Sequence, residues 1–183
     1  MRTRERTRVE QVTVTEGAVL GLLAMEGERT GYDLIKVARR SVAHVWAPAK
    51  SQLYAVLPRL ERDGLARSRA GGRERGPDRR LYRITERGER ALRSWLETVE
   101  PGDRDGFYLK TFLGGLMSQE ALVAHYRQFR VDTLEQLAVY KQLEPTNSRR
   151  GHDYHHYFLL RLGIEQAELA LTWVDQVLAE LET

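Results

Sequence analysis

The sequence of 183 residues contains no cysteine, so a disulfide framework, a thiolate zinc site and a cysteine nucleophile are all excluded. It also lacks any apolar run close to the roughly 20 residues that a membrane-spanning helix needs. Residues 1–10 are polar and contain no apolar segment of the kind found in secretory signals. We therefore expect a cytoplasmic protein.

Motifs that accompany catalysis are missing as well. The chain has no G-x-S-x-G elbow, no phosphate-binding loop, no dinucleotide fingerprint and no H-E-x-x-H pair. His152, His155 and His156 could be ligands of a metal ion. They follow a loop, however, and nothing fixes a third ligand, so a solvent-exposed first turn of a helix is the favoured interpretation of these histidines. We expect no enzyme, no cofactor and no metal site.

Negative charge is scarce in the first half of the chain. Residues 1–98 contain 21 Lys and Arg against 13 Asp and Glu, whereas residues 99–183 contain 8 against 13. Ten of these basic residues are arginines within residues 67–93. A net charge of +8 on one half and −5 on the other favours a polyanionic partner for the first half, although a solvated basic face would give the same counts.

Three helices are predicted at the start. The first covers residues 15–25, with Thr15 as N-cap and Gly27 beyond its end. A capping-box pattern at Thr30-Gly31-Tyr32-Asp33 opens the second. The third runs from Pro48 to Gly64 with an apolar stripe and a kink expected at Pro58, and the stripe consists of Leu53, Leu57 and Leu60.

Two short strands follow, over residues 65–70 and 79–84, joined by a segment rich in glycine and arginine. Residues 85–96 then form a helix that buries Leu92, Trp95 and Leu96. Three helices, a two-stranded basic wing and a closing helix make a winged helix-turn-helix domain over residues 15–98, preceded by a basic arm over residues 1–14.

The remainder is predicted to be a helical domain over residues 107–183, after a boundary at residues 101–106. A short helix over 107–117 precedes two long ones. The last helix carries an apolar stripe that a lone domain covers poorly, so we expect it to hold a homodimer; the stripe is formed by Leu162, Leu169, Trp173, Val177 and Leu181. The fold class is thus mainly α, with a small β wing.

Three segments make the chain resemble the PadR transcriptional regulators: VLGLLAMEGERTGYDL (19–34), SQLYAVLPRLERDGLA (51–66) and RRLYRITERGERALRSWL (79–96). YLKTFLGG (108–115) and the run over 161–174 resemble the virulence-activator-like C-terminal region of that family. The resemblance implies a dimeric DNA-binding repressor that a small aromatic compound often releases from its operator. The arginine-rich arm and Pro58 depart from the family pattern.

Helical geometry sorts the third helix into an apolar side and an outward side. Because the first turns of such a helix usually reach base edges, Ser51, Gln52 and Ala55 are the predicted base readers. Predicted phosphate contacts come from the later turns and the wing, namely Tyr54, Arg59, Arg62, Arg73, Arg75 and Arg79. Arg2, Arg4, Arg6 and Arg8 could follow the minor groove, but a frayed terminus explains them equally well.

An aromatic set could line a pocket for a flat effector, although aromatics at helical spacing usually belong to a core; its members are Trp95, Phe107, Tyr108, Phe112 and Trp173. The predicted partners are therefore double-stranded DNA, a second copy of the chain and a small aromatic effector. The competing hypothesis is a helical interaction module whose basic domain binds an acidic protein, and a preference for one duplex sequence separates the two.

Overall fold

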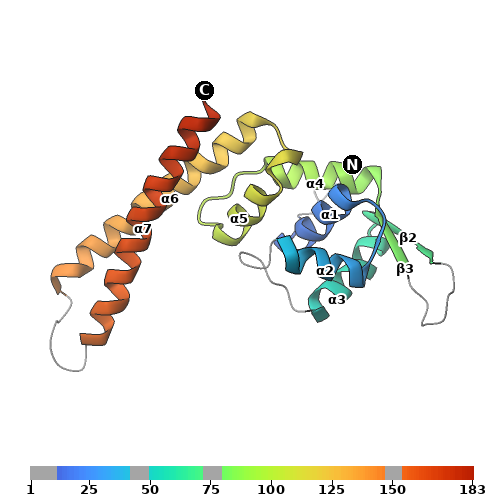
Figure 1. The fold of residues 1–183 in the computed structure, drawn as a ribbon, viewed down its shortest axis with the longest axis horizontal. Coiled ribbons are helices and arrows are strands. Elements are labelled where there is room, and N and C mark those ends of the chain that lie inside the picture. Colours follow the sequence, from blue (N-terminus) through green and yellow to red (C-terminus); the bar gives the residue numbers. More distant parts are fainter. Residues whose placement is uncertain (1–11, 42–49, 72–79, 147–153) are drawn as a thin grey trace, which may run out of the picture. The chain divides into compact units, whose positions relative to one another are not determined.

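The computed structural model describes residues 12–41, 50–71, 80–146 and 154–183. These residues form two compact units (Figure 1). The first unit holds the described residues up to Thr98 together with Tyr108–Met117, and the second holds Val99–Phe107 with Ser118–Thr183. The predicted division differs in one place, because it assigned residues 108–117 to the second domain.

The described residues of the first unit up to Thr98 form four helices and three strands. The helices are α1 (Val14–Glu26), α2 (Gly31–Ser41), α3 (Lys50–Arg62) and α4 (Glu86–Glu97). Strands β1 (Arg29–Thr30), β2 (Ala66–Ala70) and β3 (Arg80–Ile84) form an antiparallel sheet with β3 in the middle. The predicted fold class is confirmed. The two-residue strand β1, which pairs with β3 through Arg29 and Tyr82, adds a third strand to the predicted wing.

The core of the first unit surrounds α1, which is apolar on most sides and carries fully buried Val19, Leu20 and Leu23. Its N-cap is Thr13, not the predicted Thr15, because Thr13 and Glu16 complete a reciprocal capping box. The predicted end of the helix at Gly27 is confirmed. Gly27 has a positive φ of 72°, a conformation that glycine adopts without strain.

Close contacts fix the helices around this core. At Gly88 of α4 an added Cβ would lie 2.0 Å from the Leu65 carbonyl oxygen, so only glycine lets α4 begin against β2. The predicted capping pattern at the start of α2 is confirmed. Thr30 donates its hydroxyl to Asp33 at 2.6 Å and accepts from the Asp33 amide at 3.1 Å.

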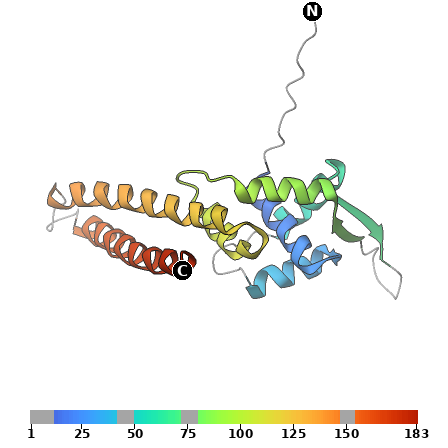
Figure 2. The same cartoon turned by 90° about the horizontal axis from the view of Figure 1, so that it is seen from above.

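Helix α5 (Arg104–Phe112) begins three residues before the predicted start at residue 107, because Asp103 accepts a hydrogen bond from the Gly106 amide in its first turn. A 3-10 turn, η1 (Gly114–Leu116), follows it. The long helices are α6 (Gln119–Leu143), with a second 3-10 turn η2 (Glu144–Thr146), and α7 (Tyr154–Leu181). They lie alongside each other in both cartoon views (Figure 2).

Some predictions fall on residues outside the described ranges. They concern the basic arm, Pro48 before α3, the wing arginines Arg73, Arg75 and Arg79, and His152 in the segment before α7. Helix α3 continues through Pro58, and the predicted kink there stays a prediction.

Candidate nucleic-acid interface

Helix α3 is anchored by its inner side. Leu53, Leu57 and Leu60 are at most 1% exposed, which confirms the predicted apolar stripe. At Gly31, the first residue of α2, an added Cβ would lie 3.0 Å from both the Leu57 and the Tyr54 side chains. The two helices therefore approach closely enough to hold α3 in one orientation.

The outer side of α3 carries the predicted base readers. Ser51, Gln52, Tyr54 and Ala55 in the first turns are exposed, and so is Arg62 in the last turn. Half of the Tyr54 surface is accessible to solvent. At 100° per residue, Gln52 and Tyr54 lie on opposite flanks of α3, with Ser51, Ala55 and Arg62 between them.

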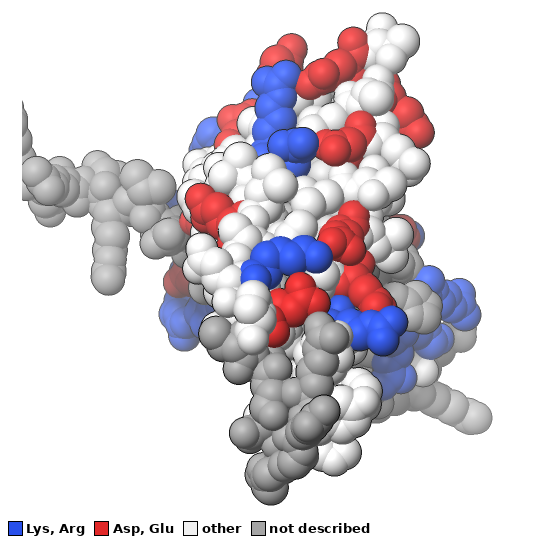
Figure 3. Space-filling model, turned by 90° about the vertical axis from the view of Figure 1, so that its left-hand side faces the viewer, with Lys and Arg blue, Asp and Glu red and all other residues white. Residues whose placement is uncertain are grey.

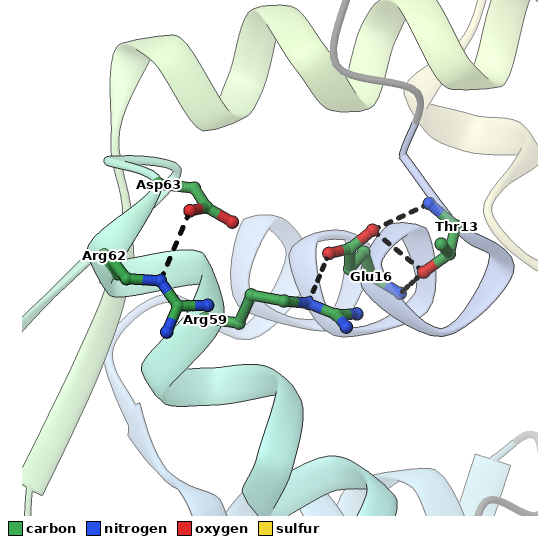
Figure 4. Close-up of polar contacts among 5 residues, drawn as sticks. All are labelled: Thr13, Glu16, Arg59, Arg62 and Asp63. Atoms are coloured by element: carbon green, nitrogen blue, oxygen red, sulfur yellow. Dashed lines mark hydrogen bonds and ion pairs between the residues drawn. The ribbon is translucent and has the colours of Figure 1, made fainter.

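Arg59 is placed differently from the other predicted phosphate contacts. Its Nε lies 2.8 Å from Oε1 of Glu16, and the Glu16 side chain is only 11% exposed (Figure 4). The N–H direction does not meet the geometry of a hydrogen bond, so the contact is an ion pair. The Arg59 side chain itself remains 42% exposed. One end of the guanidinium is therefore tied to α1, while the side chain still reaches solvent.

Arg62 has a looser environment. Its Nε lies 3.7 Å from Oδ1 of its neighbour Asp63, and 73% of the side chain is exposed (Figure 4). An exposed ion pair at that distance contributes little to stability. Arg62 can therefore turn toward a phosphate without breaking a structural contact.

The base of the wing is arginine-rich on its outer face. Arg67 and Arg83 are register partners on β2 and β3, and both are exposed. Together with Glu28 and Arg69 they line a hollow of about 410 Å³ next to the turn after α1. Arg69 donates two hydrogen bonds to Glu28, one of them at 2.9 Å from Nε. These bonds are the largest cause of the lowered pKa of Glu28. Burial opposes them as the second-largest effect, and the charges of Arg69, Arg83 and Arg67 each lower the pKa by less.

One wing arginine is held by α3. Arg80 of β3 lies 3.2 Å from Glu61, which also accepts a hydrogen bond of 2.7 Å from Ser68 of β2. Glu61 therefore links the end of α3 to both strands of the wing. The predicted wing contacts Arg73, Arg75 and Arg79 lie outside the described residues.

In the second unit, α7 packs on α6 through Leu160, Ile164, Ala167 and Val174, which are all buried. Of the predicted dimer stripe, Leu162 and Leu169 lie on the opposite side of α7, whereas Trp173 packs against Tyr126 and Phe129 of α6. Leu162 is 50% exposed, Leu169 70% and Trp173 39%, whereas Val177 and Leu181 are partly buried. Figure 3 shows a face of the molecule on which acidic and basic groups lie next to each other, surrounded by uncharged surface.

The predicted effector residues are distributed over both units. Phe107 stacks on Phe129 at 4.1 Å between ring centroids and meets Trp173 edge-on at 6.3 Å in the second unit. Trp95, Tyr108 and Phe112 belong to the first unit, where Trp95 is buried below Lys110. Lys110 is 2% exposed and donates a hydrogen bond of 2.6 Å to the Thr98 carbonyl.

Two further observations concern the described ranges alone. No group of three or more His, Cys, Asp or Glu residues in them could hold a metal ion. None of the helices in this part of the chain combines the length and the hydropathy of a membrane span.

Glu16 is the residue that the sequence did not identify. The capping-box spacing of Thr13 and Glu16 is a local signal for the cap. The partner of the second carboxylate oxygen, Arg59, is 43 positions away, and only the packing of α1 against α3 reveals it.

Comparisons with known proteins agree on one family. A family model described as "Transcriptional regulator PadR-like family" matches residues 19–94, and "Virulence activator alpha C-term" matches residues 104–182. The negative transcriptional regulator PadR of Bacillus subtilis is 29% identical over 180 residues, which cover 92% of this chain and 98% of that protein.

Two other similarities extend over most of the chain. The probable transcriptional regulator Rv1176c of Mycobacterium tuberculosis is 26% identical over 175 residues, which cover 86% of this chain and 92% of that protein. A crystal structure of Bacillus subtilis PadR in complex with operator DNA is 24% identical, covers 92% of this chain and 99% of that chain, and has a TM-score of 0.47.

Proposed function

Because the chain belongs to the PadR-like family of DNA-binding transcriptional regulators, we propose that it acts as a homodimeric repressor that binds a palindromic operator. Regulators of this family are not enzymes, which confirms the prediction that the chain is a regulator without catalytic activity. A protein that binds operators works where the chromosome is, so we place it in the cytoplasm. The first unit binds DNA in this proposal, and the second unit holds the dimer.

One observation carries the proposal. Helix α3 has a fully buried inner side, with Leu53 and Leu60 at most 1% exposed, and an outer side on which the predicted reading residues are all accessible. A helix held rigidly by its core side presents its outer side chains at fixed positions, as recognition in the major groove requires.

The roles along α3 follow from its direction and chemistry. Ser51, Gln52 and Ala55 lie in the first turns and read base edges. The Gln52 amide offers both a donor and an acceptor, the pair that matches adenine N6 and N7. Tyr54, Arg59 and Arg62 contact phosphates, and the wing arginines Arg73, Arg75 and Arg79 add contacts that depend on charge and not on sequence.

The second unit supports the proposed dimer because apolar side chains of α7 remain exposed in it. Around α7, the exposed Leu162 and Leu169 lie about 140–180° from the buried Leu160 and Ala167 at 100° per residue. The helix is therefore apolar on two sides, and α6 covers one of them. A second copy of the chain covers the other side, since a two-fold dimer matches the same stripe with itself.

Release of the operator is assigned to a small aromatic effector. Trp173 supports this role, because it is 39% exposed at the edge of a ring cluster with Phe107 and Tyr126. A flat aromatic molecule can add an edge-to-face contact to such a cluster. Trp95, Tyr108 and Phe112, the other predicted effector residues, belong to the first unit, and their role stays a prediction.

Selection from random duplexes tests the proposal. The full chain should enrich one palindromic sequence whose half-site centres lie about one helical turn, or a multiple of it, apart. Footprinting upstream of its own coding region should then protect a matching site, and added protein should lower transcription from it. Enrichment of no sequence would contradict DNA reading, and enrichment of a single unrepeated half-site would contradict the dimer.

A further inference from the structure

The two arginines of α3 differ in how they are held. Arg62 is 73% exposed and touches only its sequence neighbour Asp63, whereas Arg59 reaches across to a carboxylate of another helix. Around the helix, Arg59 lies only about 20° from Gln52, seven residues earlier. A base reader and a fixed arginine thus lie on one line along α3, about 10 Å apart.

Glu16 is itself fixed before it meets Arg59. Its Oε2 accepts two hydrogen bonds of 2.8 Å, one from the Thr13 amide and one from the Thr13 hydroxyl. Its Oε1 remains for the Arg59 Nε at 2.8 Å, and the whole residue is only 8% exposed. Each carboxylate oxygen has its own partner, so the carboxylate cannot rotate without losing a contact (Figure 4).

The contact occupies only one edge of the guanidinium. A guanidinium has five N–H donors, of which Nε carries one and the two terminal nitrogens carry four. In Figure 4 the two terminal nitrogens of Arg59 lie beyond the Nε that meets Glu16. They therefore retain the fork that matches two oxygens of a phosphate.

We propose that Glu16 is a positioning residue for DNA binding, which holds the Arg59 guanidinium so that its terminal nitrogens receive a backbone phosphate of the operator. The proposal rests on the proposed role of α3. Because the Arg59 side chain is already held in place before binding, it loses less conformational entropy when it contacts DNA. The anionic Glu16 thus increases affinity for a polyanion through the residue it holds.

The positioning role and simple electrostatics predict opposite changes in DNA affinity when the charge of Glu16 is removed. Replacing Glu16 with glutamine removes a negative charge near the binding surface, and by charge alone the variant should bind DNA more tightly. If Glu16 positions Arg59, the variant should bind more weakly. The two explanations therefore predict opposite changes.

The test measures affinity for the duplex selected by the wild-type chain, using E16Q, R59Q, the double variant E16Q/R59Q and the control E26Q. The control removes a carboxylate of the same helix α1 that also pairs with an arginine, Arg29 of β1. We expect E16Q to bind about two- to tenfold more weakly, the range for freezing one long side chain. E26Q should bind equally or more tightly, and E16Q should have no further effect in the R59Q background.

Equal or tighter binding by E16Q would overturn the proposal, and so would a loss in E16Q that persists undiminished when Arg59 is absent. If E16Q melts below the assay temperature, R59K decides, because lysine keeps the charge but not the fork. A two- to tenfold loss in R59K supports the positioned guanidinium, and unchanged affinity contradicts it. A wild-type chain that selects no duplex would contradict the proposed function instead, so the two failures are distinguishable.

Discussion

The two units differ in how completely each covers its own apolar side chains. In the first unit, Leu20, Leu23 and Leu60 have no exposed surface, and the exposed residues of α3 are mostly polar or small. In the second unit, Leu159 and Leu169 of α7 are each 70% exposed, and Val139 of α6 is 53% exposed. The first unit thus buries the leucines below α3 completely, whereas the second leaves large apolar side chains of α6 and α7 exposed.

The difference matches the division of labour. A helix that reads bases needs a rigid support, and the buried core below α3 provides it. A helix that holds a dimer needs apolar surface that its own unit does not use. Substitutions that test each unit separately should therefore act on different properties, and the predictions follow in order of expected size.

The largest effect is expected in the first unit. Leu60→Ala should lower the free energy of unfolding by about 2–5 kcal/mol, because it leaves a cavity at a position with no exposed surface. Met25→Ala is the matched control in the same unit, where half of the side chain is already exposed, and it should change stability by roughly 0.5 kcal/mol or less. Urea unfolding followed by circular dichroism measures both. Equal losses would mean that the first unit lacks a tightly packed core.

A substitution on the exposed stripe of the second unit should weaken dimer formation and leave the fold intact. Leu169→Glu places a carboxylate on the exposed stripe and should weaken the dimer by about 100-fold, since an unpaired charge would be buried at the interface. Ala179→Glu adds the same charge at an exposed position of α7 about 80° around the helix from Leu169 and should leave the dimer intact. Sedimentation equilibrium distinguishes them. A Leu169→Glu variant that still sediments as a dimer would remove α7 from the interface.

Within the first unit, the start of α3 should act through sequence preference. Gln52→Ala should cost about 1–3 kcal/mol of discrimination at one symmetric pair of operator positions, while binding to unrelated DNA is unchanged. Competition against every single-base operator variant measures the profile. If the profile of Gln52→Ala equals that of the wild type, Gln52 is no reader and Ser51 is the next candidate.

Replacing Arg62, in contrast to Gln52, should change the overall affinity for DNA and not the sequence preference. Arg62→Ala should weaken binding to all sequences alike and reduce the slope of log K against log salt by about 0.9, the contribution of one phosphate contact. A titration of affinity against salt concentration gives the slope. An altered rank order of operator variants would instead make Arg62 a reader.

The smallest effect concerns Glu28 at the base of the wing. Hydrogen bonds from Arg69 lower its pKa in the folded chain, so this ion pair stabilises the folded state above the usual pKa of a glutamate. The contribution is lost as the pH falls through the lowered pKa. Glu28→Gln should therefore lower the melting temperature slightly at neutral pH, and the difference from the wild type should disappear as the pH falls through the lowered pKa. A difference that is the same at neutral and acidic pH would contradict this.

Periodicity and caps predicted most of the architecture, since each helix has local signals at its ends. Ser118 and Thr85 cap their helices, and Gly27 ends α1, all within a few residues of the predicted bounds. The misplaced N-cap at Thr15 shows a limit of this approach, because two threonines compete and only the spacing to Glu16 selects Thr13. Strand β1 is two residues long and has no periodicity of its own; pairing with β3 creates it.

The candidate site was predictable only in part. Helical angles from Leu53 placed Ser51 and Ala55 opposite the core and Gln52 on a flank, and all three are exposed, because that geometry is local to one helix. They could not show that Arg59 is tied to Glu16, since this contact depends on how two helices pack. The side of α7 that α6 covers depends on packing in the same way, and the sequence alone leaves both apolar sides equivalent.

The most direct test of the comparison is the stoichiometry of the complex with the selected duplex, measured by native mass spectrometry. If the first unit reads DNA and the second joins two copies, the wild-type chain should form a complex of two chains on one palindromic duplex. Leu169→Glu should bind the same duplex weakly as a single chain. A wild-type complex with one chain that retains full affinity and sequence preference would contradict the account.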